Sequence, residues 1–290
     1  MRSEEEIITL ILTVAKSDER IRAVLLNGSR ANLHIKPDLF QDFDIVYIVN
    51  EINTFINDHT WIDIFGERLM LQMPGDMAFG EEKNSNISFR YLMLFKDHNR
   101  IDLTLFPLDK FENEFEHDSL AILLWDKDNL FPNLPASSDI DYHIKRPTQK
   151  MFADCCNEFW WVCTNVAKGL WRQEITYARD MLEMPVRKMF LQIIAWHIGV
   201  ETGFSVSFGK SGKNMQSLLS PVLYDKILLT CPDADLENTW KSLFIMADIF
   251  SDLAVKISGN LCFEYNLNED HNVTAYLKWV CSLTNETNPL

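Results

Sequence analysis

Two aspartates at the start of an apolar run are the residues of this sequence best suited to chemistry. Asp42 and Asp44 stand on either side of Phe43 in the stretch DFDIVYIV. Such a run is typical of a buried strand, where a carboxylate is costly unless it is paired or bound to a metal. Residues two apart on a strand point to the same face, so the two acids face away from the core side. Because carboxylates beside substrate phosphates are ligands that Mg²⁺ favours, the pair predicts a magnesium site.

A third aspartate repeats the pattern on a different predicted strand. Asp102 lies in the run IDLTL, where an acid alternates with apolar neighbours. It is expected to act either as a third metal ligand or as a base. The residues leave both roles open, because a bound metal would depress the basicity of the carboxylate.

A glycine-serine pair upstream of the acids predicts a phosphate-binding turn. Gly28 and Ser29 close the apolar run IRAVLLN, and Arg30 begins a possible helix. A glycine lets backbone N–H groups approach a phosphate closely, a serine hydroxyl binds another oxygen, and a helix N-terminus adds a favourable dipole. The guanidinium of Arg30 offers a fork for phosphate, with a surface ion pair as its alternative.

The first half of the chain must supply the strands that position these residues. Ser3-x-x-Glu6 is a capping-box pattern, so a helix is expected over residues 4–16. The predicted strands and hairpins are 21–27, 43–49, a hairpin over 61–73 that turns at Gly66, and a second hairpin formed by 87–95 and 100–106. A helix over 108–117 and a short apolar segment follow.

The second half has a different period and is expected to be mostly helical. Pro132, Pro135 and Pro147 punctuate a polar linker, which predicts a domain boundary between residues 135 and 136. Beyond it, apolar residues recur at three- and four-residue spacing over 148–169, 171–183, 185–203, 221–230 and 236–259. Pro185 is expected in the first turn of its helix.

Composition excludes several classes of protein. The 290 residues are 47% hydrophobic, enough for two cores, and the formal net charge is −15. An acidic protein repels phosphate backbones and attracts cations, so a nucleic-acid partner is disfavoured. No apolar run is long enough for a membrane span, and no secretion signal precedes the first helix, so the expected location is the cytoplasm.

Taken together, these motifs resemble a known family. Gly28-Ser29, twelve intervening residues and Asp42-Phe43-Asp44 look like the signature of the nucleotidyltransferase superfamily, which includes DNA polymerase beta and kanamycin nucleotidyltransferase. The segments NGSRAN, FQDFDIVYIV, RIDLTLFP, FWWVCTNVAKGLWRQEITYARDMLE and WHIGVETGFSVSFGKSGK resemble the streptomycin (aminoglycoside) 6-adenylyltransferases over most of the chain.

The resemblance implies a fold and a function. The fold is α+β: a nucleotidyltransferase (polymerase-beta-like) mixed sheet with flanking helices over residues 1–135, and a helical bundle that binds substrate over 136–290. The activity is transfer of AMP from ATP to a hydroxyl of streptomycin with release of pyrophosphate, which would confer antibiotic resistance. The protein is expected to be a monomer or homodimer.

The resemblance also assigns roles to residues. Asp42 and Asp44 match the metal-binding acids, Asp102 the third carboxylate, and Gly28 and Ser29 the phosphate-binding turn. Lys168, in the helical half, is expected to contact the nucleotide, with a solvated lysine as its alternative. Cationic streptomycin is expected to meet acids and aromatic faces of the helical half, and the candidates are Glu158, Trp160, Trp161, Trp171 and Glu174.

Two alternatives stay open from the sequence. The first is the same transfer to another hydroxyl acceptor, such as a different aminoglycoside, a lincosamide or a protein side chain. The second is a nucleotide-binding regulator without catalysis. The complete set of three acids favours an enzyme, because a binder has no need of a third carboxylate.

Overall fold

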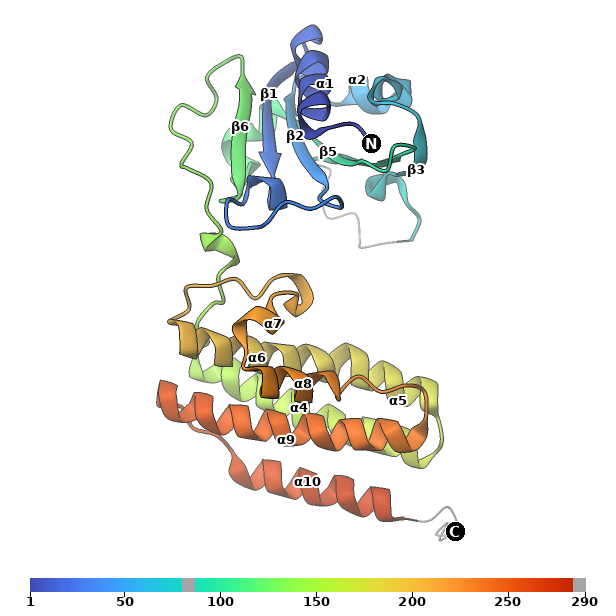
Figure 1. The fold of residues 1–290 in the computed structure, drawn as a ribbon, viewed down its shortest axis with the longest axis vertical. Helices are drawn as coiled ribbons and strands as arrows, with labels where there is room; N and C mark the ends of the chain where they lie inside the picture. Colours follow the sequence, from blue (N-terminus) through green and yellow to red (C-terminus); the bar gives the residue numbers. More distant parts are fainter. Residues whose placement is uncertain (80–86, 284–290) are drawn as a thin grey trace. The chain divides into compact units, whose positions relative to one another are not determined.

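The chain folds into two compact units, Met1–Asp141 and Tyr142–Leu290 (Figure 1). The computed structural model describes residues 1–79 and 87–283. The division lies six residues beyond the predicted boundary because the linker is tied to the first unit. The Ser137 hydroxyl donates to the Ala31 carbonyl over 2.7 Å, and the Ser138 amide donates to the Ser119 carbonyl over 2.8 Å.

The first helix, α1 (Glu4–Ser17), forms as its capping box predicts. The Glu6 amide donates to the Ser3 hydroxyl over 3.2 Å, and the Ser3 amide donates to the Glu6 carboxylate over 2.7 Å. These bonds satisfy two backbone donors that no carbonyl of the helix can reach. The helix buries Ile7, Ile11 and Val14 along one stripe.

The first unit is built on one six-stranded mixed sheet. Its strands are β1 (Ile21–Asn27), β2 (Phe43–Val49), β3 (Arg68–Gln72), β4 (Phe89–Phe95), β5 (Arg100–Pro107) and β6 (Ala121–Asp126). They lie in the order β3-β4-β5-β2-β1-β6, and β2 with β5 is the parallel pair of this sheet. The mixed sheet and the hairpin of β4 with β5 are as the sequence predicts.

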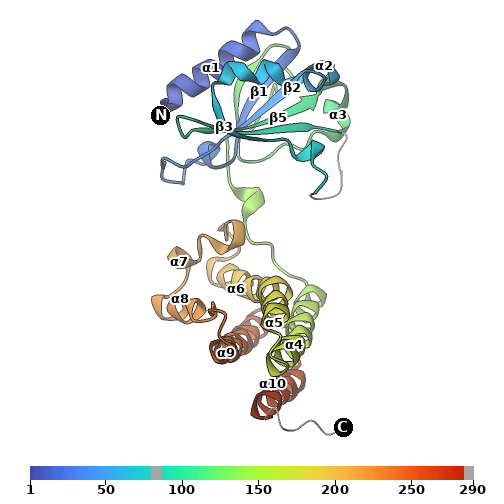
Figure 2. The same cartoon turned by 90° about the vertical axis from the view of Figure 1, so that its right-hand side faces the viewer.

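The two faces of the sheet are covered differently. On one face, Phe43, Ile45 and Tyr47 pack in a core with Ile11 of α1, and the Tyr47 hydroxyl donates to the Ile11 carbonyl over 2.7 Å. Figure 2 shows α1 lying along this face. On the other face, a smaller apolar cluster around Phe106 covers only part of the sheet. The site residues lie on this second, incompletely covered face.

Short helices after β5 pack against this smaller apolar cluster. The 3₁₀ turn η4 (Leu108–Lys110) leads into α3 (Phe111–Glu114), whose Phe111 stacks on Phe115 with ring centroids 5.0 Å apart. The helix predicted over 108–117 is therefore correct in place but ends early. Phe115 already has extended backbone.

The hairpin predicted at Gly66 is wrong. Residues His59–Phe65 form a 3₁₀ helix, η2, and only β3 after it is a strand, which pairs with β4. The Asp58 carboxylate accepts the Thr60 amide over 2.9 Å and so starts helical turns. Gly66, with φ of 122°, ends them. The apolar residues that alternate in WIDIF resemble a strand, but the cap at Asp58 favours helical turns there instead. Two further short elements are α2 (Asn53–Ile56) and η3 (Pro74–Asp76).

The second unit is helical, as predicted. Its helices are α4 (Gln149–Trp171), α5 (Ile175–Met181), α6 (Arg187–Thr202), α7 (Met215–Leu218), α8 (Pro221–Leu228), α9 (Leu236–Leu261) and α10 (Leu267–Ser282). Its core includes Phe159 of α4 and Phe250 of α9, whose rings stack with centroids 3.7 Å apart. Helix α10 was not expected from the sequence. The short 3₁₀ turn η5 (Ile140–Tyr142) precedes α4, and the turn η7 (Lys210–Gly212) lies between α6 and α7.

Pro185 does not begin a helix. It lies inside η6 (Leu182–Val186), a π-helical segment that joins α5 to α6 without a break. A proline ring clashes with the carbonyl four residues earlier in an α-helix, and the wider π turn relieves that clash. The expected helix boundary is therefore replaced by a continuous, locally widened helix.

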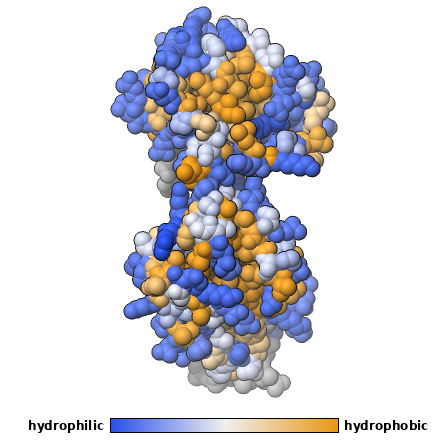
Figure 3. All heavy atoms as spheres, turned by 60° about the vertical axis from the view of Figure 1, so that its left-hand side comes forward, coloured by the Kyte–Doolittle hydropathy of each residue, from blue (hydrophilic) through white to orange (hydrophobic). Residues whose placement is uncertain are grey.

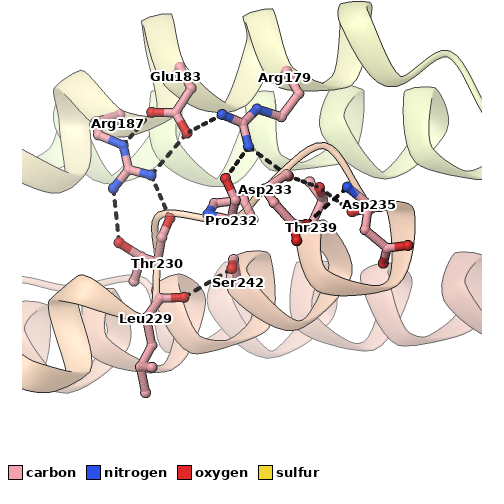
Figure 4. A network of polar contacts seen from close by, with 10 residues as sticks. All are labelled: Arg179, Glu183, Arg187, Leu229, Thr230, Pro232, Asp233, Asp235, Thr239 and Ser242. Carbon is pink, nitrogen blue, oxygen red and sulfur yellow. Dashed lines mark hydrogen bonds and ion pairs between the residues drawn. The ribbon is translucent and has the colours of Figure 1, made fainter.

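A polar network fastens the loop before α9 to this widened helix (Figure 4). Arg187 pairs with Glu183 over 2.7 Å and donates to the carbonyl and hydroxyl of buried Thr230 over 2.5 and 2.9 Å. Arg179 donates to the carbonyls of Pro232 and Asp233 over 2.5 and 2.9 Å. These bonds satisfy loop carbonyls that would otherwise be desolvated without partners.

Across residues 1–79 and 87–283, neither unit has a helix that is long and apolar enough to cross a bilayer. Apolar side chains do reach the surface of each unit, as the orange atoms in Figure 3 show. Large exposed apolar residues include Phe40 in the first unit and Val222 in the second.

Replacing Arg187 tests the polar network. We expect Arg187→Ala to lower the free energy of unfolding of the second unit by about 1–3 kcal/mol, because the Thr230 carbonyl loses a charged donor. Differential scanning calorimetry measures the change. Lys241→Ala, which removes an exposed pair with Glu237, is the matched control and is expected to change stability by less than about 0.5 kcal/mol. Equal losses in both variants would contradict the role given to Arg187.

Candidate active site

Three strand ends meet at one edge of the sheet and bring the candidate acids together. Strands β2 and β5 are parallel neighbours, so their first residues lie at the same edge, with Asp44 directly opposite Asp102. Strand β1 runs antiparallel to β2, so its last residue, Asn27, lies opposite Asp44 on the other side. Directly paired residues point to the same face of a sheet. Asn27, Asp44 and Asp102 thus form one polar row across three strands.

Gly28 follows this row and leaves room for Asp44. Its φ is +73°, and a Cβ placed on it would lie 2.3 Å from Asp44 Oδ2. Its amide donates to the Leu120 carbonyl over 3.0 Å, which fixes the turn beside β6. Only glycine accepts this backbone angle together with so close a carboxylate.

Ser29 lies in a tight turn rather than at the start of a long helix. Residues Gly28–Ala31 form the 3₁₀ turn η1. The Ser29 carbonyl accepts the Asn32 amide over 3.3 Å. In the part of the chain that the structure describes, the Ser29 hydroxyl has no hydrogen-bond partner, which leaves it open to a ligand. Its contact with phosphate stays a prediction.

Arg30 is held by the protein itself. Its Nε donates to the Asp42 carbonyl over 3.1 Å, its Nη2 donates to the Gln41 carbonyl over 2.9 Å, and its Nη1 pairs with Glu4 over 2.7 Å. The guanidinium also stacks on the Phe43 ring, 3.8 Å from the centroid, and the side chain is only 10% exposed. These contacts fix the backbone that carries Asp42. The contact of Arg30 with phosphate is a prediction that this geometry does not favour.

Burial and mutual repulsion raise the pKa values of the candidate acids Asp42 and Asp44. Burial, followed by repulsion from Asp102 and Asp42, raises the pKa of Asp44 to about 6. Burial also raises the pKa of Asp42, and the positive charge of Arg100 partly opposes this rise. Both shifts report carboxylates that are short of positive charge at neutral pH.

Arg100 is the cation that contacts these acids. It begins β5, two residues before Asp102 and therefore on the same face. Its Nε and Nη2 donate to the two carboxylate oxygens of Asp102, each over 2.7 Å. Its Nη1 lies 3.6 Å from Asp42 Oδ2. The guanidinium thus bridges acids that belong to neighbouring strands.

The residues present fit a magnesium ion that shares its ligands with a nucleotide. In residues 1–79 and 87–283, no group of three or more His, Cys, Asp or Glu side chains is arranged to hold a metal ion by itself. Mg²⁺ is usually held by one or two carboxylates together with phosphates and water, and Asp42 with Asp44 supplies such a pair. The carboxamide oxygen of Asn27 is buried beside them and accepts no hydrogen bond from the residues that the structure describes. Asp102 is engaged by Arg100, so whether it joins the metal stays open.

Sequence reasoning missed Asn27 and Arg100. Both are adjacent to motifs that it used: Asn27 precedes Gly28, and Arg100 lies two residues before Asp102. The two-residue spacing of Arg100 and Asp102 was a usable signal, because it places both on one face of a strand. Nothing local marked Asn27, whose position opposite Asp44 depends on the pairing of β1 with β2.

The residues predicted in the second unit differ in their surroundings. Lys168 lies in the last turn of α4 and is half-buried. Trp160 is buried in the helical core and lines a hollow of about 540 Å³ with Asp154, Glu264 and Glu269, whereas neighbouring Trp161 is exposed. The predicted nucleotide contact of Lys168 and the predicted streptomycin contacts stay predictions. The other candidates are Glu158, Trp171 and Glu174, of which Trp171 has a buried indole nitrogen without a partner.

Comparison with known proteins gives the site its context. The family model described as streptomycin adenylyltransferase matches residues 1–280. This chain belongs to that family. It is an adenylyltransferase, an enzyme that uses ATP as co-substrate, and the resemblance predicted from the sequence is confirmed.

Similar proteins match along nearly their whole length. An aminoglycoside 6-adenylyltransferase from Campylobacter jejuni is 43% identical over 93% of each chain. One from Bacillus subtilis (strain 168) is 41% identical, covering 98% of this chain and 100% of that protein. A solved structure of an aminoglycoside 6-adenyltransferase from Bacillus subtilis is 36% identical, with a TM-score of 0.49 over 98% of this chain and 100% of that one.

Adding one methyl group to Gly28 tests the close approach of Asp44. We expect Gly28→Ala to lower kcat/KM by about 10²-fold, because the new Cβ displaces the Asp44 carboxylate. Pyrophosphate release from ATP measures the effect. Gly203→Ala is the matched control, since Gly203 has a similar φ of +64° but nothing within 4 Å of a Cβ. If both variants keep their turnover, Asp44 does not need this space.

The raised pKa of Asp44 also predicts how the stability of the protein depends on pH. The folded-state pKa of Asp44 is raised from 3.8 to about 6, so its stabilising contribution is full below pH 3.8 and is lost as pH rises through about 6. Asp44→Asn should therefore gain stability relative to the parent protein between pH 4 and 7.5, as measured by thermal unfolding in EDTA.

Asp97 is the matched control for this titration. Burial favours a higher pKa for Asp97, but hydrogen bonds from Arg2 and Asn99 outweigh burial and hold the pKa well below its ordinary value. Its contribution is present above pH 3.8 and lost as pH falls further, so Asp97→Asn should lose stability at neutral pH. The same sign of pH dependence in both variants would contradict the assignment.

Proposed function

We propose that this adenylyltransferase transfers AMP from ATP to a hydroxyl of streptomycin and releases pyrophosphate. The observation that carries the proposal is the polar row of Asp44 and Asp102 on adjacent parallel strands, beside the open turn of Gly28. Relatives that match almost end to end are named aminoglycoside 6-adenylyltransferases. The geometry supports nucleotidyl transfer, and the names of the relatives support an aminoglycoside as the acceptor.

The residues have distinct roles in this reaction. The backbone turn at Gly28 and the hydroxyl of Ser29 receive phosphate oxygens of ATP, at the edge of the sheet where the acids lie. Asp42 and Asp44 supply the carboxylates for Mg²⁺, with Asp102 as the candidate third ligand. When bound there, Mg²⁺ would neutralise charge that develops on the phosphate oxygens. Arg30 keeps the backbone of Asp42 in place.

Transfer itself exchanges one oxygen for another at the α-phosphorus. The hydroxyl oxygen of the acceptor forms a bond to that phosphorus, the bond to the β-phosphate oxygen breaks, and pyrophosphate leaves. The proton of the hydroxyl passes to a carboxylate within reach, for which Asp102 is the candidate once Arg100 no longer occupies both of its oxygens. Correct positioning of the two substrates supplies much of the remaining acceleration.

The charge of the protein supports a cationic acceptor. Streptomycin carries guanidinium groups, and a net charge of −15 attracts and retains cations. The hollow lined by Asp154, Glu264 and Glu269 in the second unit adds a local concentration of acids beside the aromatic face of Trp160. An uncharged hydroxyl acceptor would form no ion pairs with these acids.

A panel of acceptors tests the reaction. The purified protein with ATP and Mg²⁺ is expected to add one AMP to streptomycin, with the modified hydroxyl located by mass spectrometry of fragments. Other aminoglycosides and a lincosamide are tested in parallel. Turnover on a different member, with none on streptomycin, would overturn the acceptor while leaving the chemistry intact. No turnover on any member, with ATP still bound, would indicate a regulator instead.

Single replacements test the acids. We expect Asp42→Asn or Asp44→Asn to lower kcat by about 10³-fold or more, because the charge that holds the metal is lost while the fold persists. Asp63→Asn, which removes an exposed acid paired with Arg68, should keep normal turnover. Circular dichroism checks the fold of each variant. Retained turnover in both site variants would refute the role of this pair.

A further inference from the structure

Arg100 occupies the position among the carboxylates where a positive charge is most needed. Its guanidinium binds both oxygens of Asp102 over 2.7 Å and reaches Asp42 Oδ2 at 3.6 Å. In the described residues, Asp42 and Asp102 each form an ion pair with Arg100. The guanidinium is therefore the counter-ion that holds these acids together across two strands.

The two contacts of Arg100 differ in strength. The contact with Asp102 is a two-point hydrogen-bonded pair between a guanidinium and a carboxylate, the strongest geometry for such an ion pair. The contact with Asp42 is longer and single. The Arg100 side chain is 42% exposed, so it can move toward solvent without breaking the core. A movable cation anchored at one acid and loosely placed at another is suited to exchange with a second cation.

We propose that Arg100 is a built-in counter-ion that competes with the divalent metal for Asp42 and Asp102, and that loading the site requires its guanidinium to leave them. This inference rests on the proposed function, because it assumes that the acids bind a metal. It gives Arg100 a role in metal loading, whereas the proposed function only requires that Arg100 release Asp102. It also explains how three acids remain close together when no metal is bound: Arg100 offsets their mutual repulsion.

The same exchange bears on Asp102. A carboxylate whose two oxygens both accept from a guanidinium is a poor proton acceptor and a poor metal ligand, because its lone pairs are engaged. Departure of Arg100 therefore frees Asp102 for either role. Asp44 has no ion pair with Arg100 among the described residues, so it is the acid that the guanidinium leaves accessible to a metal.

Binding of Mn²⁺ without nucleotide tests the competition. Free Mn²⁺ is measured by electron paramagnetic resonance with the full-length protein. We expect Arg100→Gln to bind Mn²⁺ about tenfold more tightly than the parent protein, because a competing cation a few ångströms away has been removed. Arg100→Lys keeps the charge and should remain close to the parent. Weaker or unchanged binding by Arg100→Gln, including no detectable binding in both proteins, would overturn the proposal.

Two further variants separate the possible explanations. Arg68→Gln removes the same charge from an ion pair with Asp63, outside the carboxylate row, and should bind Mn²⁺ like the parent. If Arg68→Gln tightens Mn²⁺ binding as much as Arg100→Gln does, the effect comes from net charge alone and the role of Arg100 is overturned. In the Arg100→Gln background, Asp42→Asn should abolish the tighter binding. If it does not, the tighter site lies elsewhere and the competition at Asp42 is wrong.

Failure of this proposal and failure of the proposed function have different signatures. Unchanged Mn²⁺ affinity in Arg100→Gln, with streptomycin still adenylylated by the parent, overturns the competition alone. Tighter Mn²⁺ binding that depends on Asp42, in a protein that adenylylates no acceptor, supports the competition and overturns the acceptor chemistry. Thermal unfolding gives an independent readout: Arg100→Gln should lose stability without metal and recover more than the parent when Mn²⁺ is added.

Discussion

The structure of the first unit depends on how it tolerates like charges on one face of a sheet. Asp44 and Asp102 lie opposite each other on the central strands, and Asp42 precedes them at the same edge. Carboxylates this close repel each other, and burial makes the repulsion stronger. Arg100, on the same face, offsets part of this repulsion, and the pKa of Asp44 is still raised, first by burial and then by repulsion from Asp102 and Asp42. A site that is short of positive charge is prepared to bind a cation.

The surrounding elements position that charge. One face of the sheet packs against α1 in the main core, which fixes β1, β2 and β5 against one another. The other face carries only a small apolar cluster, so its edge remains open to ligands. The glycine turn after β1 brings its backbone against Asp44, and Arg30 fastens the backbone of Asp42 from behind. These contacts, rather than the acids themselves, fix the positions of the carboxylates.

In the second unit, long helices pack together although one of them contains a proline and a long loop joins two others. The π-helical turn keeps α5 and α6 continuous around Pro185. Arg179 and Arg187 project from that widened helix and bind the loop before α9. The continuity of the helix and the position of the loop therefore depend on the same short segment. The acid-lined hollow between α4 and the start of α10 is formed in this frame.

Local patterns were sufficient for much of this description. The capping box of α1, the alternation in β2 and β5, the helical period of the second half and the spacing of Gly28 from the acids are all properties of neighbouring residues, and the elements they predict are present. The family was also recognisable, because its motifs are short and chemically specific. Local reasoning failed where a cap or a wider turn intervened, as at Asp58 and Pro185.

What only the tertiary structure decided is the identity of neighbours. The parallel pairing of β2 with β5 joins segments more than fifty residues apart, and no local period specifies which strands become adjacent or in which direction they run. That pairing places Asp102 opposite Asp44, sets Arg100 between the acids and leaves the Asn27 oxygen buried beside them. The sequence determined which residues are capable of chemistry. Long-range strand pairing decided which of them share one site, because hydrogen bonding between strands depends on proximity in space and not on distance along the chain.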